Sequence, residues 1–125
     1  MDKDVTSKLA GRRLLVVEND YIIAVDVAGT LETLGADVLG PAATVKDALD
    51  LIESGRVDGA SLDINLGEES VYPVADALRA RGVPFVFTSG YDPKVIPLPY
   101  ADVPRCSKPL NSRALARALA SCFDS

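Results

Sequence analysis

The sequence predicts an α/β fold, in which a parallel sheet is doubly wound with helices on both faces. Short apolar runs alternate along the chain with amphipathic stretches at helical spacing, and this alternation is typical of such folds. Consecutive residues within each run are apolar, as expected for strands that are covered on both faces. The 125 residues, 48% of them hydrophobic, are sufficient for the core of one domain.

The first half of the chain contains three of the expected strands. Residues 1–11 are polar, and we expect a loose leader there, before a domain over residues 12–125. RRLLVVE is the first strand, and the helix after it should stop at Gly35. ADVLGPA is the second strand, ended by Gly40 and Pro41, and TVKD is a capping box that opens a helix closed by Gly55. VDGASLDI is the third strand.

In the second half, Ser70 is expected to cap a helix with Pro73 in its first turn, which Gly82 ends. VPFVFTS is a fourth strand rich in β-formers. Four prolines between residues 90 and 104 exclude a long helix there. A short strand over residues 103–107 and an amphipathic helix in NSRALARALASCF complete the pattern.

Polar side chains gather where the expected strands end. The residues concerned are Glu18, Asn19, Asp63, Asn65, Ser89 and Lys108. Ligands bind at the carboxyl ends of the strands in open parallel sheets, so these groups should converge. Oxygen ligands suit Mg²⁺, and a carboxylate can attack phosphorus when a metal ion, a lysine and a hydroxyl stabilise the phosphoryl oxygens.

Each of these residues also has a plain structural interpretation. Asp63 alone is more often a turn former or helix cap, and Lys108 and Ser89 alone are more often solvated loop groups. Asp20 could lean towards a metal, but we favour its role as the start of the first long helix, because neighbouring side chains at a strand end point to opposite sides. The joint pattern at one sheet edge favours a site.

Charge and composition exclude several classes of function. The net charge of −5, from 18 acids and 13 bases, argues against a nucleic-acid binder. No apolar run is long enough for a membrane span or a signal peptide, and Cys106 and Cys122 imply no disulfide framework, so we expect a cytoplasmic protein. Because histidine is absent, any phosphohistidine must come from a partner.

Over roughly residues 12–123 the chain resembles the receiver domain of two-component response regulators. The resemblance rests on four motifs that occur in order: LLVVEND, LDINLG, PFVFTSGY and SKPL. PFVFTSGY is similar to the PFxFATGY motif of the "FAT GUY" subgroup. The resemblance implies a flavodoxin-like five-stranded sheet of order 2-1-3-4-5, with a reduced or missing helix between the fourth and fifth strands. It also implies a receiver domain over residues 12–125.

The resemblance further implies that Asp63 accepts phosphate from a sensor histidine kinase or a histidine phosphotransfer protein. Glu18 would hold Mg²⁺ through water, Asn19 directly, and Asn65 through its backbone carbonyl. Ser89 and Lys108 would contact the phosphoryl oxygens. The Lys108–Pro109 bond is expected to be cis.

Two residues depart from the family pattern. Asn19 stands where an aspartate is usual, which removes one negative charge and should weaken Mg²⁺ binding. Arg105 stands where an aromatic residue usually swings inward on activation. We therefore expect the loop over residues 90–104, with Tyr91, to carry the conformational response.

The expected function is signalling through protein contacts with a downstream target, with a phosphorylation-dependent dimer as one form of output. The chain would promote its own phosphorylation and dephosphorylation rather than turn over a substrate. We expect a stand-alone receiver or one cut from a longer protein. An alternative is a pseudo-receiver that acts by binding alone, with impaired metal binding and little or no phosphorylation. A small hydrolase with Asp63 as nucleophile ranks below the pseudo-receiver, because Asn65 stands where such an enzyme would have a second acid. A nucleotide-binding fold also ranks below it, because no Gly-rich loop follows the first strand.

Overall fold

The computed structural model describes residues 3–90, 96–108 and 110–123. Five parallel strands form one sheet in the order β2-β1-β3-β4-β5, as the resemblance implied. The strands are β1 (Arg13–Val17), β2 (Asp37–Ala42), β3 (Gly59–Asp63), β4 (Phe85–Ser89) and β5 (Arg105–Ser107). The helices are α1 (Lys3–Leu9), α2 (Tyr21–Thr33), α3 (Val45–Ser54), α4 (Tyr72–Ala80) and α5 (Ser112–Ser121).

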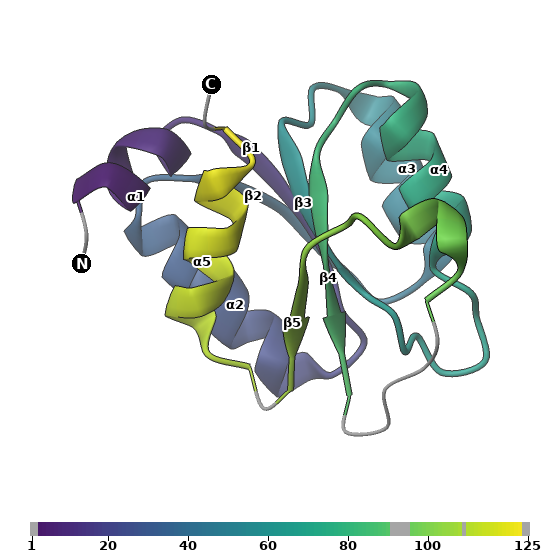
Figure 1. Ribbon diagram of the computed structural model, residues 1–125. Coiled ribbons are helices and arrows are strands. Elements are labelled where there is room, and N and C mark those ends of the chain that lie inside the picture. Colours follow the sequence, from purple (N-terminus) through teal and green to yellow (C-terminus); the bar gives the residue numbers. More distant parts are fainter. Residues whose placement is uncertain (1–2, 91–95, 109, 124–125) are drawn as a thin grey trace.

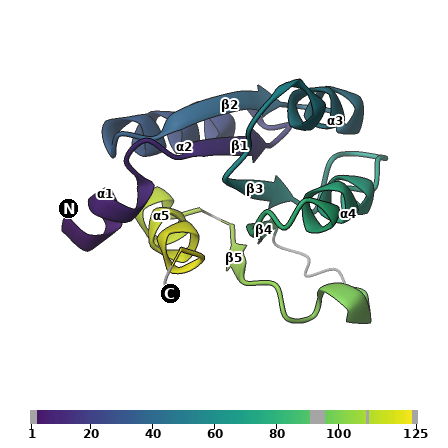
Figure 2. The ribbon, with the colours of Figure 1, turned by 90° about the horizontal axis from the view of Figure 1, so that it is seen from above.

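Helices cover both faces of the sheet, so the doubly wound prediction is confirmed (Figures 1 and 2). On one face, α3 and α4 pack over the side chains of Leu15, Leu62 and Phe87. On the other face, α1, α2 and α5 pack over the side chains of Leu14, Val16 and Val86. Successive residues of β1 and β4 therefore belong to different cores, as the two-residue period of a strand requires.

Residues Lys3–Leu9 form helix α1, so the expected loose leader is wrong for this segment. Val5 and Leu9, spaced i and i+4, lie on one face of the helix and are 5% and 0% exposed. They pack into the core beside Leu14 and Leu115. α1 lies beside α5 (Figure 1). Burial of two apolar side chains orders a sequence whose other residues are polar.

Strand β2 continues through Gly40 and Pro41 to Ala42, so these two residues do not end the strand as expected. Its register with β1 shifts there, because three steps of β2 lie opposite two of β1. Gly40 takes a φ of +93°, which a glycine adopts at little cost, and the Gly40–Pro41 bond is cis. Pro41 is tolerated because β2 is an edge strand of the sheet.

The helix ends follow the expected signals with one exception. Thr44 accepts a hydrogen bond from the Asp47 N–H at the start of α3, and Asn111 caps α5 in the same way. The N-cap of α4 is Val71 and not Ser70, although the Ser70 hydroxyl accepts a long bond of 3.4 Å from the Tyr72 N–H. Between β4 and β5 the described residues form only a 3-10 turn, η1 (Leu98–Tyr100), which agrees with the reduced helix expected there.

Two expectations fall on residues outside the described ranges. They are the cis bond before Pro109 and the response of Tyr91. No helix in the described part of the chain is long and apolar enough to cross a membrane.

Candidate functional site at the carboxyl edge of the sheet

The carboxyl edge brings together three of the predicted site residues in direct contact. Lys108 Nζ lies 3.0 Å from Glu18 Oε1 and 3.3 Å from Asp63 Oδ2. Glu18 follows β1, Asp63 ends β3 and Lys108 follows β5. These strands are not adjacent to one another in sequence, and the parallel sheet places their carboxyl ends together.

Asp63 is fully buried, with 0% of its surface exposed. Its Oδ1 accepts a hydrogen bond from the Asn65 N–H at 2.9 Å, and its Oδ2 receives Lys108. Both carboxylate oxygens are therefore held by donors, as buried polar atoms require. Asn65 itself is half-buried in the loop after β3.

Glu18 is also buried, with 5% of its surface exposed. Burial raises the pKa of Glu18 to about 7; the Asp20 N–H opposes this rise, and the Asp63 carboxylate adds to it. The Asp20 N–H donates to Glu18 Oε2 at 3.0 Å, while Asp20 Oδ1 caps α2 through the Ile22 and Ile23 N–H groups. The helix-start interpretation of Asp20 is thereby confirmed.

Lys108 supplies the positive charge of the site. Burial works against its charged form, but the hydrogen bonds and charges of Glu18 and Asp63 outweigh this and raise the pKa of Lys108. Its backbone N–H donates to the Ser89 carbonyl at 2.7 Å, which extends the pairing of β4 with β5. Ser89, 3% exposed, stands at the end of β4.

Asn19 lies at the rim of the site, exposed, with its amide nitrogen beside Gly67 of the loop after β3. Among the residues that the structure describes, no group of three or more acidic or cysteine side chains could hold a metal ion. The donors that the sequence assigns to a metal ion are two carboxylates, the Asn19 amide and the Asn65 carbonyl. These hard oxygen donors suit Mg²⁺ with retained waters, although their charge is low.

Comparisons with known proteins identify the family of the chain. No protein-family model matches the chain. The solution structure of SdrG from Sphingomonas melonis Fr1 superposes with a TM-score of 0.80 and 37% identity, over 94% of this chain and 98% of SdrG. The chain belongs to the receiver domains of response regulators.

Two further relatives extend the comparison. A CheY-like response regulator receiver protein from Methanospirillum hungatei JF-1 matches with a TM-score of 0.76 and 26% identity, over 92% of this chain and 95% of that one. The phyllosphere-induced regulator PhyR of Methylorubrum extorquens is 32% identical over 81 residues, or 62% of this chain. The matched part spans only 30% of PhyR. Receiver domains typically bind Mg²⁺ and pair with histidine kinases.

The sequence did not point to one exposed feature beside the site. Tyr21 and Ile22, at the start of α2, are each 79% exposed, and Val25 is 49% exposed. A sequence signal for this exposed group was present, because α2 carries apolar residues on its outer side as well as on its inner side. Large apolar side chains grouped on a surface indicate contact with a partner.

Proposed function

We propose that this receiver accepts a phosphoryl group on Asp63 from a phosphohistidine of a partner protein. The contact of the buried Asp63 carboxylate with Lys108 carries the proposal. An Asp63 oxygen attacks phosphorus, and an acyl phosphate forms as the P–N bond breaks. The electron pair of that bond returns to the histidine ring of the partner.

Lys108 and Ser89 take the roles of phosphoryl-contacting groups in this proposal. The ammonium of Lys108 already lies at Asp63 Oδ2, where it can neutralise charge that develops on the phosphoryl oxygens. Ser89 occupies the end of the neighbouring strand, and β4 is paired with β3 from Ala60 to Asp63. Both groups are held by the sheet, so they need little reorganisation during the transfer.

For Mg²⁺, the assigned ligands are Glu18 through water, Asn19, Asp63 and the Asn65 carbonyl. When bound, the ion would supply positive charge to the phosphoryl oxygens. Glu18 is engaged by Lys108 and by the Asp20 N–H, and Asn19 is neutral. These two observations also favour a second candidate function, a pseudo-receiver whose metal binding is impaired and which acts by protein contact.

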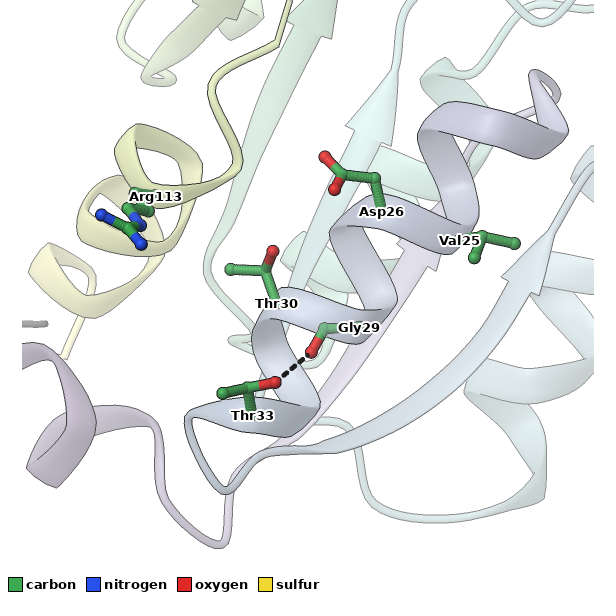
Figure 3. A pocket seen from close by; sticks show the side chains of 6 residues that line it. All are labelled: Val25, Asp26, Gly29, Thr30, Thr33 and Arg113. Atoms are coloured by element: carbon green, nitrogen blue, oxygen red, sulfur yellow. Dashed lines mark hydrogen bonds between the residues drawn. The ribbon is translucent and has the colours of Figure 1, made fainter.

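The phosphodonor is inferred to dock over the exposed start of α2. Tyr21, Ile22 and Val25 directly follow the site, and a hollow of about 490 Å³ continues along the helix. Figure 3 shows that its lining comes from α2, with Arg113 of α5 on the other side. Its lining residues are Val25, Asp26, Gly29, Thr30, Thr33 and Arg113.

The FAT GUY subgroup is inferred from PFVFTSGY alone, in which Thr88 and Ser89 replace the Ala-Thr pair of PFxFATGY. Signalling to a downstream protein is proposed from the receiver fold. SdrG has also been solved in a BeF₃-activated conformation, which matches this chain with 36% identity and a TM-score of 0.76 over 98% of SdrG. Beryllofluoride is therefore a suitable probe of the activated state of this receiver.

Intact-mass measurement tests the proposed function. The chain is incubated with a small phosphodonor, with and without Mg²⁺, as wild type, Asp63→Asn and Asp47→Asn. Asp47 is an exposed acid of α3 and serves as the matched control. We expect metal-dependent addition of one phosphoryl group that only Asp63→Asn abolishes. No addition to the wild type, even with a cognate kinase, would favour the pseudo-receiver.

Docking is tested separately from chemistry. Ile22→Ala should slow transfer from a histidine kinase and leave addition from the small phosphodonor unchanged, because Ile22 lies outside the site. Equal rates of transfer from the kinase to wild type and Ile22→Ala would remove α2 as the docking surface.

A further inference from the structure

The first turn of α5 is joined to α2 by a hydrogen bond between two side chains. The Ser112 hydroxyl donates to the carboxylate of Asp26, an exposed residue in the second turn of α2. Figure 3 shows the Asp26 carboxylate directed towards α5. The two residues are 86 positions apart in the sequence, so the bond ties together two segments that are separate along the chain.

Lys108 lies between a short strand and this end of α5. The strand before it, β5, has three residues, lies at the edge of the sheet and pairs with β4. The side chains of β5 are half-buried or exposed, so the strand has no fully buried anchor. Ser112 begins α5 four residues after Lys108. A bond that fixes the start of α5 therefore restricts the positions that Lys108 can take.

The first turn of α5 has few buried anchors of its own. Residues 112–114 are half-buried or exposed, and the first fully buried side chain of the helix is that of Leu115. Asn111 caps the helix, but its side chain accepts hydrogen bonds from N–H groups of α5 itself. The bond from Ser112 to Asp26 is a polar contact that ties this turn to a different element.

The helix α2 also holds the partner of Lys108 in the site. Asp20 caps α2 and donates its N–H to Glu18 Oε2 at 3.0 Å, while Glu18 Oε1 lies 3.0 Å from Lys108 Nζ. Asp20 and Asp26 are about 9 Å apart along the helix axis. The helix thus reaches Glu18 through its cap. It reaches the Lys108 side of the ion pair through Asp26.

We propose that Asp26 is a positioning residue for Lys108. By holding Ser112, it fixes the start of α5, and the Lys108 ammonium is then kept between the two carboxylates of the site. A misplacement of about 1 Å at a reacting group can slow a reaction by up to about a hundredfold, so the position of this ammonium matters for phosphoryl transfer. This inference rests on the proposed function.

NMR of the lysine ammonium groups, recorded on the whole chain, tests the proposal. The Lys108 signal is assigned by its loss in Lys108→Arg. Lys46 forms a 2.8 Å ion pair within α3 and gives an internal reference. We expect Ser112→Ala and Asp26→Ala to shift the Lys108 signal and to leave the Lys46 signal in place. Ser112→Thr keeps a hydroxyl and should keep the wild-type signal. The matched control is Glu32→Ala, which removes another exposed acid of α2.

The affinity for beryllofluoride gives a second measurement, followed with Mg²⁺ by the shifts of the Ser89 and Lys108 amides. We expect Ser112→Ala to weaken binding about threefold. Loss of a hydrogen bond to a charged group can cost about tenfold or more, but this pair is exposed to solvent. Asp26→Asn keeps an acceptor oxygen without its charge and should lie between the wild type and Asp26→Ala. The double variant of Asp26→Ala with Ser112→Ala should match either single variant, because both remove the same bond.

The outcomes separate the positioning role from the proposed function. If beryllofluoride does not bind the wild type, the proposed function fails, and the ammonium signals still test whether Asp26 positions Lys108. If the wild type binds it and Ser112→Ala keeps both the Lys108 signal and the affinity, Asp26 has no positioning role. Lower stability in urea with an unchanged Lys108 signal would overturn the proposal, because the bond would then be structural only. Additive effects in the double variant would also overturn it. If Ser112→Ala does not fold, Asp26→Asn decides by the same criteria.

Discussion

Substitution of Leu9 by alanine should destabilise the whole domain, although Leu9 lies in a short polar helix at the start of the chain. Leu9 has 0% of its surface exposed and packs with Leu14 and Leu115 in the core on the face of the sheet that α1, α2 and α5 cover. Fully enclosed Leu→Ala substitutions cost about 3–5 kcal/mol. Because α1 has only seven residues and can shift to fill part of the cavity, we expect a loss of about 3 kcal/mol.

A loss of this size is large for a single domain. Domains are stable by only about 5–15 kcal/mol, so Leu9→Ala should remove roughly a fifth to three fifths of the free energy of unfolding. For a chain of this length, the melting temperature should fall by roughly 10 °C. Urea unfolding followed by far-ultraviolet circular dichroism measures the change, with an unaltered slope as the check that only stability has changed.

Ser7→Ala is the matched control for Leu9→Ala. Ser7 lies in the same helix and is exposed, and its hydroxyl donates to the Asp4 carbonyl one turn away, so the substitution should change stability by less than about 0.5 kcal/mol. Val5→Ala, at a site 5% exposed, should fall between the two. If Leu9→Ala and Ser7→Ala have the same midpoint in urea, α1 is not part of the core and the reasoning is wrong.

The remaining predictions concern the proposed metal site, a tyrosine and a glycine. Asn19→Asp adds a charged ligand and should tighten Mg²⁺ binding on the order of tenfold in calorimetric titration, whereas equal affinities would remove Asn19 as a ligand. The bond to Asp76 and burial raise the pKa of Tyr100 above 10.0, so this stabilisation is present below pH 10 and is lost above it. Stability should then fall more steeply above pH 10 in the wild type than in Tyr100→Phe, and parallel pH profiles would contradict this. A Cβ at Gly59 would lie 3.0 Å from the Phe123 ring and 3.2 Å from Leu14, so Gly59→Ala should cost about 1–3 kcal/mol in urea unfolding, and an unchanged midpoint would show that Phe123 moves aside.

The strands and the convergence of Glu18, Asp63 and Lys108 could be predicted from sequence because they depend on local patterns. Apolar runs mark strands covered on both faces, and the sheet then brings the residue after each strand to one edge. The ion pairs of Lys108 with both carboxylates follow from that geometry. The position of each of these three residues directly at or after the end of a strand was sufficient to place it at the carboxyl edge of the sheet.

What could not be predicted depends on contacts between distant segments. Val5 and Leu9 are too few to indicate a helix, and only the core beside them orders α1. The continuation of β2 depends on the bulge opposite β1, which no turn signal reports. The stacked rings of Tyr72 and Tyr100 come from positions 28 residues apart, and no local sequence pattern indicates that they meet.

The hydrogen bond from the Lys108 N–H to the Ser89 carbonyl, 2.7 Å long, joins the backbones of the two residues that we propose contact the phosphoryl group. On the other side of β4, the Ile64 N–H donates to the Thr88 carbonyl, so the residue after Asp63 is tied to the same strand. The backbone positions of Asp63, Ser89 and Lys108 are therefore set by the pairing of β3, β4 and β5. Substitutions in the surrounding loops can then change what binds beside the site while the spacing of these three backbone positions is kept.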